Sequence, residues 1–273
     1  MSQVTSNQEN RPWDDFNGLG RYYQFRPEYP VQIAEELRSM VKGSTGGQII
    51  EVGAGTGLFS RTLATAFGPD FRVLALEPND DMRRHAELAT PAGLSINYAN
   101  GIAEHLSVDD SSIQLLVAAS AVHRFNRPLF YHEARRVLAT DGVLAFVQYE
   151  PDDKGSSFAD GFLSIVETAL PNYKRRRSSR PGGGYFDLDL TAELKAERAF
   201  KDIERHAFVF AETIDWDMFS QRALSFTIVQ KAIASKGEDT MASDLRQLFA
   251  DHQTPQGRVE MPFEAEVITA RLA

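Results

Sequence analysis

The sequence predicts an α/β fold in which a doubly wound, mostly parallel sheet carries a helical cap. The first observation is a β-branched apolar run at residues 49–52, followed by a glycine turn and by apolar residues at helical spacing over residues 58–67. The second is that further apolar runs alternate with helical patterns as far as residue 149. The third is an amphipathic stretch at residues 157–170, which lies outside this alternation and is expected in the cap.

The remaining elements follow from the same two periodicities. Strands are expected at residues 71–76, 94–98, 113–119, 143–149, 203–211 and 258–272. Helices are expected at residues 31–41, 126–138 and 241–251, with one or two helices at residues 215–236. The run at residues 113–119 is apolar throughout, which is typical of a strand buried on both faces of a parallel sheet.

The glycine turn after the first strand is a predicted ligand site. Glycine is needed where φ is positive or where a ligand approaches the backbone closely. The start of the following helix offers unpaired N–H groups and about half a positive charge, which suits a carboxylate or a phosphate. The spacing is Gly-x-Gly-x-Gly, and Leu58 stands where a dinucleotide-binding turn has its last glycine. The candidate residues here are Gly53, Ala54, Gly55 and Gly57, with the acidic Glu51 inside the strand.

An acidic residue at the end of the second strand is the next candidate. The carboxylate of Glu77 can accept hydrogen bonds from both hydroxyls of a ribose, and its distance from the glycine turn fits a βαβ unit. The alternative is that Glu77 only complements the dipole of the helix that follows it.

Composition and charge restrict the class of partner. The chain has 273 residues, no cysteine and a net charge of −9. The absence of cysteine excludes a disulfide framework, a thiolate zinc site and a cysteine nucleophile, and the histidines show no metal-binding spacing, so no metal is expected. An acidic surface disfavours nucleic acid as a partner. No apolar stretch approaches the roughly 20 residues of a membrane span, and a cytoplasmic protein is expected.

Four ordered segments carry a resemblance to a known family. Glu51-Val-Gly-Ala-Gly-Thr-Gly57 resembles motif I of the class I S-adenosylmethionine (SAM)-dependent methyltransferases. Residues 100–107 are similar to Gly-Asp-Ala-Glu-x-Leu-Pro, with Ile102 for the acid and Ser107 for the proline. Residues 121–125 are similar to Ala-Leu-His-Trp-Phe, with Arg124 for the tryptophan, and residues 136–144 are similar to Arg-Val-Leu-x-Pro-Gly-Gly.

A fifth segment lies ahead of these four. Residues 22–30 read Tyr-x-x-Phe-Arg-Pro-x-Tyr-Pro and resemble the N-terminal signature of methyltransferases related to trans-aconitate methyltransferase. The chain is thus similar to the trans-aconitate and ubiquinone-type small-molecule methyltransferases. In the first of these groups the segment lies over the SAM pocket, so Tyr22 and Arg26 are expected at its mouth; the alternative is a packing segment.

The resemblance implies a seven-stranded sheet that ends in an antiparallel pair, and it assigns roles to residues around SAM. Glu77 and the adjacent Pro78 would hold the ribose end, and Met82 would lie against the adenine unless it is only a core filler. Gly101, Ile102 and Ala103 would offer backbone and apolar surface to the adenine. Ser120 ends the fourth strand beside the cofactor, and His123 would emerge near the methyl group, because ligands of open α/β sheets lie beyond the carboxyl ends of the strands.

Four regions are expected along the chain. Residues 1–30 would cover the cofactor pocket, and residues 31–150 would form the SAM-binding core. Residues 151–200 would be a cap or substrate insertion over the carboxyl edge of the sheet. Residues 201–273 would supply the strands and helices that complete the sheet and the cap.

The expected reaction is methyl transfer from SAM to a small-molecule acceptor, either an anionic compound or a secondary metabolite. Positioning of the nucleophile can supply roughly 7–11 kcal/mol of the barrier, and a general base adds about 10²–10⁴-fold. His123 is the candidate base because histidine titrates near neutral pH; the alternative is a structural histidine bonded to a loop. Two other functions stay open: a SAM-fold protein that binds a partner or catalyses another reaction, and a nicotinamide-dependent oxidoreductase.

A basic run and several aromatic residues are weaker candidates for acceptor binding. Residues 174–177, together with Arg180, form the dense positive patch of the chain and could bind a carboxylate or a diphosphate. The alternative is a solvated loop. An apolar acceptor site could be walled by Tyr173, Tyr185, Phe186 and Trp216. The identity of the acceptor, the methylated atom and the oligomeric state do not follow from the sequence.

Overall fold

The computed structural model describes residue 11 and residues 13–41, 46–175 and 188–273. Its strands are β1 (Gly47–Val52), β2 (Phe71–Leu76), β3 (Ile96–Ala99), β4 (Ile113–Ala119), β5 (Leu138–Pro151), β6 (Phe200–Asp215) and β7 (Arg258–Leu272). Its α-helices are α1 (Gly20–Tyr23), α2 (Val31–Met40), α3 (Leu58–Phe67), α4 (Asp80–Ala89), α5 (Arg127–Val137), α6 (Ser157–Ala169), α7 (Leu190–Ala196), α8 (Trp216–Leu224), α9 (Thr227–Lys236) and α10 (Glu238–His252).

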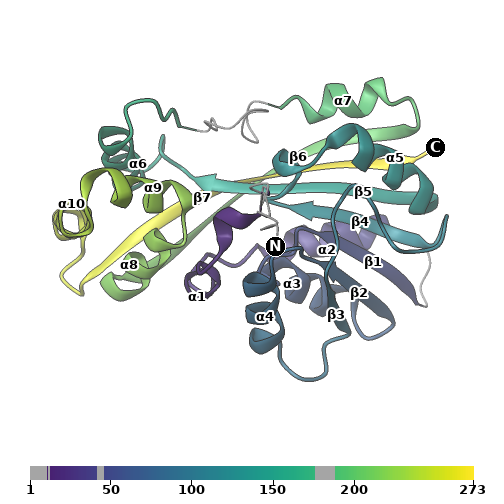
Figure 1. Ribbon diagram of the computed structural model, residues 1–273, viewed down its shortest axis with the longest axis horizontal. Helices are drawn as coiled ribbons and strands as arrows, with labels where there is room; N and C mark the ends of the chain where they lie inside the picture. Colours follow the sequence, from purple (N-terminus) through teal and green to yellow (C-terminus); the bar gives the residue numbers. More distant parts are fainter. Residues whose placement is uncertain (1–10, 12, 42–45, 176–187) are drawn as a thin grey trace, which may run out of the picture.

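The described strands form one seven-stranded sheet in the order β3-β2-β1-β4-β5-β7-β6 (Figure 1). Strands β1 to β5 pair in parallel, and β7 runs antiparallel to both β5 and β6. This confirms the predicted fold class and the antiparallel pair at the end of the sheet. The strand order reverses between β1 and β4, which is the point where open α/β sheets bind their ligands.

Two hydrophobic clusters cover the two faces of the sheet. One face buries side chains of α2, α3 and the cap, including Ile33, Leu63 and Phe162. The other face buries side chains of α5 and α7, including Phe130 and Leu194. The inner strands are therefore covered on both sides, which explains why their sequences are continuous apolar runs.

Of the last three strands, β5 and β6 are longer than their apolar runs predict, whereas β7 has the predicted bounds. Strand β5 has 14 residues, β6 has 16 and β7 has 15. The β6–β7 ladder continues as far as the pair of Asp215 with Arg258. Backbone pairing along an antiparallel ladder does not need a buried side chain at every position, so polar residues extend β5 and β6.

The cap consists of α6, α8, α9 and α10, which gather at one end of the molecule (Figure 1). Its centre is aromatic: the Phe219 ring contacts those of Phe158, Phe162 and Phe249, and Phe158 also contacts Phe249. Helix α7 lies elsewhere, against β6 and β7 near α5 (Figure 1). The expected insertion at residues 151–200 therefore sends α6 to the cap and α7 to the opposite face of the sheet, and the domain boundaries themselves stay predictions.

Candidate functional site

A cavity of about 530 Å³ opens at the carboxyl ends of the central strands. Its wall combines the N-terminal segment, the ends of β1, β2, β4 and β5, and residues of the cap. Thirteen of the sequence-predicted site residues line it: Arg26, Glu51, Gly53, Ala54, Gly55, Glu77, Pro78, Met82, Gly101, Ile102, Ala103, Ser120 and His123. The two that do not line it are Tyr22 and Gly57.

The three glycines of the turn have different reasons to be glycine. All adopt positive φ, at 72° for Gly53, 58° for Gly55 and 73° for Gly57. A Cβ at Gly53 would lie 2.6 Å from the Cβ of Ala121. A Cβ at Gly57 would collide with the hydroxyl of Tyr98. Gly57 therefore permits close packing at the start of α3, whereas Gly53 and Gly55 face the cavity.

Glu77 is held in a fixed orientation at the end of β2. It is buried, and its Oε2 accepts a hydrogen bond from the Gly55 N–H (2.8 Å) while its Oε1 accepts one from the Asn79 N–H (2.9 Å). Burial raises the pKa of this carboxyl, and the two backbone donors oppose that shift. The carboxylate is thus anchored from the glycine turn and from the start of α4 while it lines the cavity.

Glu51 is a second buried carboxyl on the same cavity. Its hydrogen-bond partner is the hydroxyl of Ser60, which donates to Oε2. Burial raises the pKa of Glu51 to about 8, the Ser60 hydrogen bond opposes this, and the charge of Glu77 adds to it. At neutral pH the ligand-free protein therefore holds Glu51 mostly protonated.

His123 lies in a 3-10 turn, Val122–Arg124, directly after β4. Its Nδ1 is buried on the cavity wall, and the described residues offer that atom no hydrogen-bond partner. Burial lowers the pKa of His123 to about 4, with further contributions from the charges of Arg124 and Arg127. The imidazole is neutral at pH 7 and weakly basic in the ligand-free protein.

The N-terminal segment, residues 13–26, covers one side of the cavity with Trp13, Phe16, Tyr23 and Arg26. Tyr23 rather than Tyr22 lies on the cavity wall. Tyr22 instead stacks under the guanidinium of Arg21, at 4.6 Å from the ring centre. Which of two adjacent tyrosines faces inward depends on how the short helix α1 docks, and residues 22–23 carry no signal for that choice.

The start of α4 holds this segment in place. The amide nitrogen of Asn79 donates to the backbone oxygen of Trp13 (3.0 Å) and to Oδ1 of Asn17 (2.8 Å). Asp81 accepts hydrogen bonds from the N–H groups of Gly18 and Gly20, both at 3.1 Å.

Arg124, the departure from the family pattern, also contacts the N-terminal segment. Its guanidinium lies 4.3 Å from the centre of the Phe16 ring, a cation–π distance. The substituted position therefore still closes the cavity against this segment.

The cavity continues under the cap beyond the residues predicted from the sequence. Gln148, Tyr149 and Glu150 line it from the end of β5, and Phe226 and Lys231 line it from the α8–α9 region. The sequence analysis missed them. The position of Gln148 and Glu150 at the carboxyl end of a parallel strand was the available signal.

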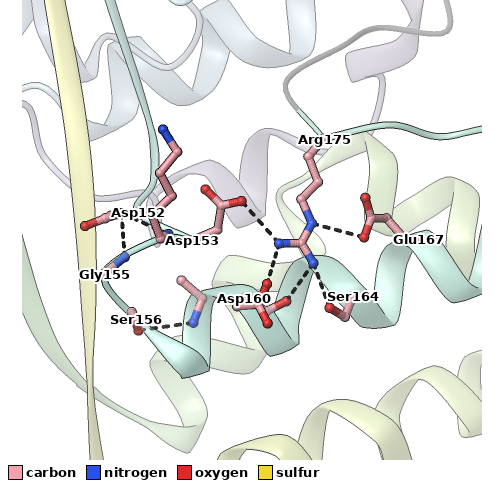
Figure 2. Close-up of polar contacts among 10 residues, drawn as sticks. Asp152, Asp153, Gly155, Ser156, Asp160, Ser164, Glu167 and Arg175 are labelled. Carbon is pink, nitrogen blue, oxygen red and sulfur yellow. Dashed lines mark hydrogen bonds and ion pairs between the residues drawn. The ribbon is translucent and has the colours of Figure 1, made fainter.

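Two residues of the basic run are described: Lys174 is exposed, and Arg175 is bound to neighbouring acidic side chains. The Arg175 guanidinium contacts Asp153 (3.2 Å), Asp160 (2.5 Å), Glu167 (3.0 Å) and Ser164 (2.7 Å), and so ties its segment to α6 (Figure 2). Arg175 is therefore a structural residue and not a substrate-binding one. Arg176, Arg177 and Arg180 lie outside the described residues.

The aromatic candidates separate in the same way. Tyr173 lines the cavity. Trp216 does not line it and packs against Phe219 and Phe249 in the cap. Tyr185 and Phe186 lie outside the described residues.

In the described part of the chain, no three His, Asp or Glu side chains come together in a way that could hold a metal ion. No described helix has both the length and the apolar character needed to cross a membrane.

Comparisons with known proteins agree with the fold. Residues 49–142 match the family model described as a methyltransferase domain. A Dictyostelium discoideum protein whose methyltransferase assignment is provisional is 30% identical over 140 residues, which cover 50% of this chain and 49% of that protein. The malonyl-[acyl-carrier protein] O-methyltransferase of Geobacter sulfurreducens is 27% identical over 182 residues, 63% of each chain. The chain thus spans about half the length of the first relative and under two thirds of the second.

Solved structures extend the likeness of fold over almost the whole chain. A protein from Anaeromyxobacter dehalogenans, provisionally named a type II methyltransferase, superposes with a TM-score of 0.67 at 23% identity and covers 90% of this chain and 97% of its own. A Haemonchus contortus phosphoethanolamine N-methyltransferase, solved with S-adenosylhomocysteine, superposes with a TM-score of 0.52 at 14% identity and covers 95% of this chain and 58% of its own.

These matches agree with the strand order and the glycine turn. Residues 49–142 match a methyltransferase domain, and the fold is that of the class I SAM-dependent methyltransferases, whose cofactor is S-adenosylmethionine. This confirms the resemblance to class I methyltransferases and the cofactor that it implies. The closer similarity to the trans-aconitate and ubiquinone-type groups stays a prediction.

Proposed function

We propose that this protein transfers the methyl group of SAM to a small-molecule acceptor bound under the cap. The observation that supports this most is the single cavity that joins the glycine turn and Glu77 to residues of the cap, with His123 on its wall. A methyltransferase needs both ligands in one enclosed space, because the acceptor must reach the methyl group directly.

The cofactor would be held by the residues predicted from the sequence. Both oxygens of Glu77 already accept backbone hydrogen bonds, and their remaining lone pairs would accept the two ribose hydroxyls. The apolar surfaces of Met82, Ile102 and Ala103 would hold the adenine. Glu51 would face the positively charged end of the cofactor, which favours its ionised form.

Ser120 and Tyr29 would complete the cofactor site on the β4 side. Ser120 has φ of 52°, a conformation that is uncommon outside glycine. Its hydroxyl is hydrogen bonded to that of Tyr29 at 2.9 Å. This pair supports the expected place of Ser120 beside the cofactor.

When bound, SAM supplies a methyl group on a cationic sulfur, which is already electrophilic. The protein then mainly has to hold the acceptor atom in line with the methyl group, and this positioning can supply about 7–11 kcal/mol of the barrier. If the acceptor atom carries a proton, Nδ1 of neutral His123 would take that proton as the bond to carbon forms. An anion bound nearby would raise the pKa of His123 from its low value and make the imidazole a stronger base.

The acceptor is proposed to be anionic. Arg26 lines the cavity with its Nε buried and without a hydrogen-bond partner among the described residues. Its guanidinium stacks at 3.8 Å on the Phe226 ring and donates to the Ser225 carbonyl oxygen (3.2 Å), which fixes its direction. A guanidinium held in this way suits a carboxylate or a phosphate.

Titration calorimetry with S-adenosylhomocysteine tests the cofactor site. We expect binding to the wild type and at least a tenfold weaker affinity for Glu77→Ala, since a hydrogen bond to a charged group contributes about 1.5–3 kcal/mol. Glu87→Ala is the matched control, because Glu87 is exposed on α4. Absence of binding to the wild type, or binding of NAD in its place, would contradict the proposal.

Turnover with labelled SAM and a panel of acceptors tests the chemistry. If His123 is the base, His123→Asn should slow methyl transfer by about 10²–10⁴-fold while S-adenosylhomocysteine binds as tightly as before. A rate within twofold of the wild type would remove His123 from the reaction. Binding of SAM without transfer to any acceptor would favour a protein that uses the fold only for binding.

A further inference from the structure

Unsatisfied buried polar atoms gather on the wall of the cavity. In the described part of the chain, Arg26 Nε, Thr56 Oγ1, His123 Nδ1 and Gln148 Oε1 are buried without a hydrogen-bond partner, and all four residues line the cavity. Buried polar atoms in folded proteins are nearly always paired. A ligand that enters this space would therefore be selected for groups that pair with them.

Gln148 is the most constrained of these residues. Its side chain is 5% exposed at the end of β5. Its amide nitrogen donates to the backbone oxygen of Tyr149 (3.1 Å) and to Oε1 of Glu150 (2.9 Å). Both partners are acceptors, so the amide cannot be turned around without placing oxygen against oxygen. Oε1 is therefore the free atom, and it can only accept a hydrogen bond.

The sheet brings Gln148 close to the reacting end of the cavity. Strands β4 and β5 are parallel neighbours, with Ala119 opposite Val147, and the Ser120 N–H donates to the Val147 oxygen at 2.7 Å. Gln148 comes one residue later on β5, at the same edge from which the chain leads to His123. Gln148 and His123 line the same cavity, so an acceptor that fills it can contact both.

Arg26 and Gln148 make opposite demands on a ligand. Arg26 Nε offers a hydrogen bond, which an oxyanion satisfies best. Gln148 Oε1 needs a donor, which an oxyanion lacks. Glu150, beside Gln148, also disfavours a second negative charge at this point, because like charges repel.

We propose that Gln148 is a specificity-determining residue that accepts a hydrogen bond from an O–H or N–H group of the methyl acceptor, so that the site takes a small hydroxy- or amino-substituted anion. This inference rests on the proposed function. An analogue with hydrogen in place of that group leaves Gln148 Oε1 buried and unpaired, which weakens its binding by about 5- to 150-fold. Sites built in this way reject the analogue that lacks the donor more strongly than pockets that select by size.

Titration calorimetry on the protein saturated with S-adenosylhomocysteine tests the proposal with matched acids. The first set is salicylate, anthranilate and benzoate, and the second is malate, aspartate and succinate. We expect the hydroxy or amino member of at least one set to bind at least fivefold more tightly than its unsubstituted member, and the comparison of salicylate with anthranilate separates O–H from N–H. Equal affinities within both sets, or no binding of any acid, would overturn the proposal.

Variants then assign the preference to one atom. Gln148→Met keeps the length of the side chain and removes the amide oxygen, so we expect the preference to fall below twofold. Gln247→Met is the matched control, because Gln247 is exposed on α10 and does not line the cavity. A preference that survives in Gln148→Met would overturn the proposal.

Titration with S-adenosylhomocysteine distinguishes failure of the proposed function from failure of the role assigned to Gln148. If S-adenosylhomocysteine does not bind the wild type, the proposed function fails. If it binds and the acids are not discriminated, only the role of Gln148 fails. The affinity of Gln148→Met for S-adenosylhomocysteine also reports whether the variant is folded, and the wild-type comparison stands without it.

Discussion

Among the single residues of the site, two buried glutamates, Glu77 and Glu51, line the cavity in different surroundings. Glu77 accepts two backbone N–H groups, whereas Glu51 has the hydroxyl of Ser60. Burial raises the pKa of both carboxyls, and that of Glu51 reaches about 8. The backbone donors make Glu77 suited to hydrogen bonding with neutral hydroxyls, whereas at pH 7 a nearby cation shifts Glu51 toward its ionised form.

We expect SAM binding at pH 7 to release a proton from Glu51. A cationic ligand favours the ionised carboxyl, so SAM affinity should rise with pH up to about 8. Calorimetry in phosphate and in Tris, which differ in ionisation enthalpy, measures the protons released. Glu51→Gln should abolish the release, and an unchanged release in this variant would contradict the assignment.

The same group makes the stability of the ligand-free protein depend on pH. The pKa of Glu51 is raised from 4.5 to about 8, so the folded state binds more protons than the unfolded state between these values. The free energy of unfolding should therefore fall as pH rises from about 4.5 to about 8. Denaturant titrations across this range should show a smaller fall for Glu51→Gln.

At the scale of elements, the start of α4 connects the cofactor site to the segment that covers it. Asn79 caps α4 by accepting from the Met82 N–H at 3.0 Å, and its amide nitrogen holds Trp13 and Asn17. Asp81, in the first turn of the same helix, holds the next part of the segment. Residues 79–81 thus anchor both Glu77 and the N-terminal segment.

The substitution Asn79→Asp distinguishes the capping of α4 from the hydrogen bonds to Trp13 and Asn17. Aspartate caps a helix as well as asparagine does, but its carboxylate cannot donate to Trp13 or Asn17. We expect faster hydrogen exchange at residues 13–20 and faster dissociation of S-adenosylhomocysteine, with exchange in α4 unchanged. Asn79→Ala is the comparison, since it loses the cap as well. Unchanged exchange in the segment would show that Asn79 does not hold it.

At the scale of the whole molecule, the cavity lies where the strand order reverses and is lined by the N-terminal segment, the sheet and the cap. A ligand in this position contacts all three parts. Binding should therefore stabilise them together, because a ligand that binds only the folded state adds its free energy to the complete fold.

We expect the protein to unfold in one transition, and S-adenosylhomocysteine at 100 times its Kd should raise the Tm of that transition. The added stability is about 2.7 kcal/mol, which corresponds to roughly 5–10 °C for a chain of this size. Differential scanning calorimetry measures the shift, and Glu87→Ala should match the wild type. Two transitions of which only one moves would mean that the cap unfolds separately from the cofactor site.

Local patterns in the sequence were enough for the core of the fold and for the cofactor end of the site. The alternation of apolar runs and helical spacing predicted strands β1, β2 and β4 and helix α3, because burial and chain geometry act on neighbouring residues. The glycine turn and Glu77 were predicted for the same reason, since their places follow directly from the ends of two strands.

The tertiary structure decided what depends on contacts between distant residues. It turned Tyr23 and not Tyr22 toward the cavity, bound Arg175 to α6, and separated α7 from the cap. It also brought Arg26, His123 and Gln148 to one cavity. The sequence by itself determined the places of the strands, of several helices and of the cofactor end, whereas the bounds of α1, α4 and α7 became evident only in the structure. The pairing of polar side chains under the cap was decided only by folding, because it depends on how the N-terminal segment, the sheet and the cap pack against one another.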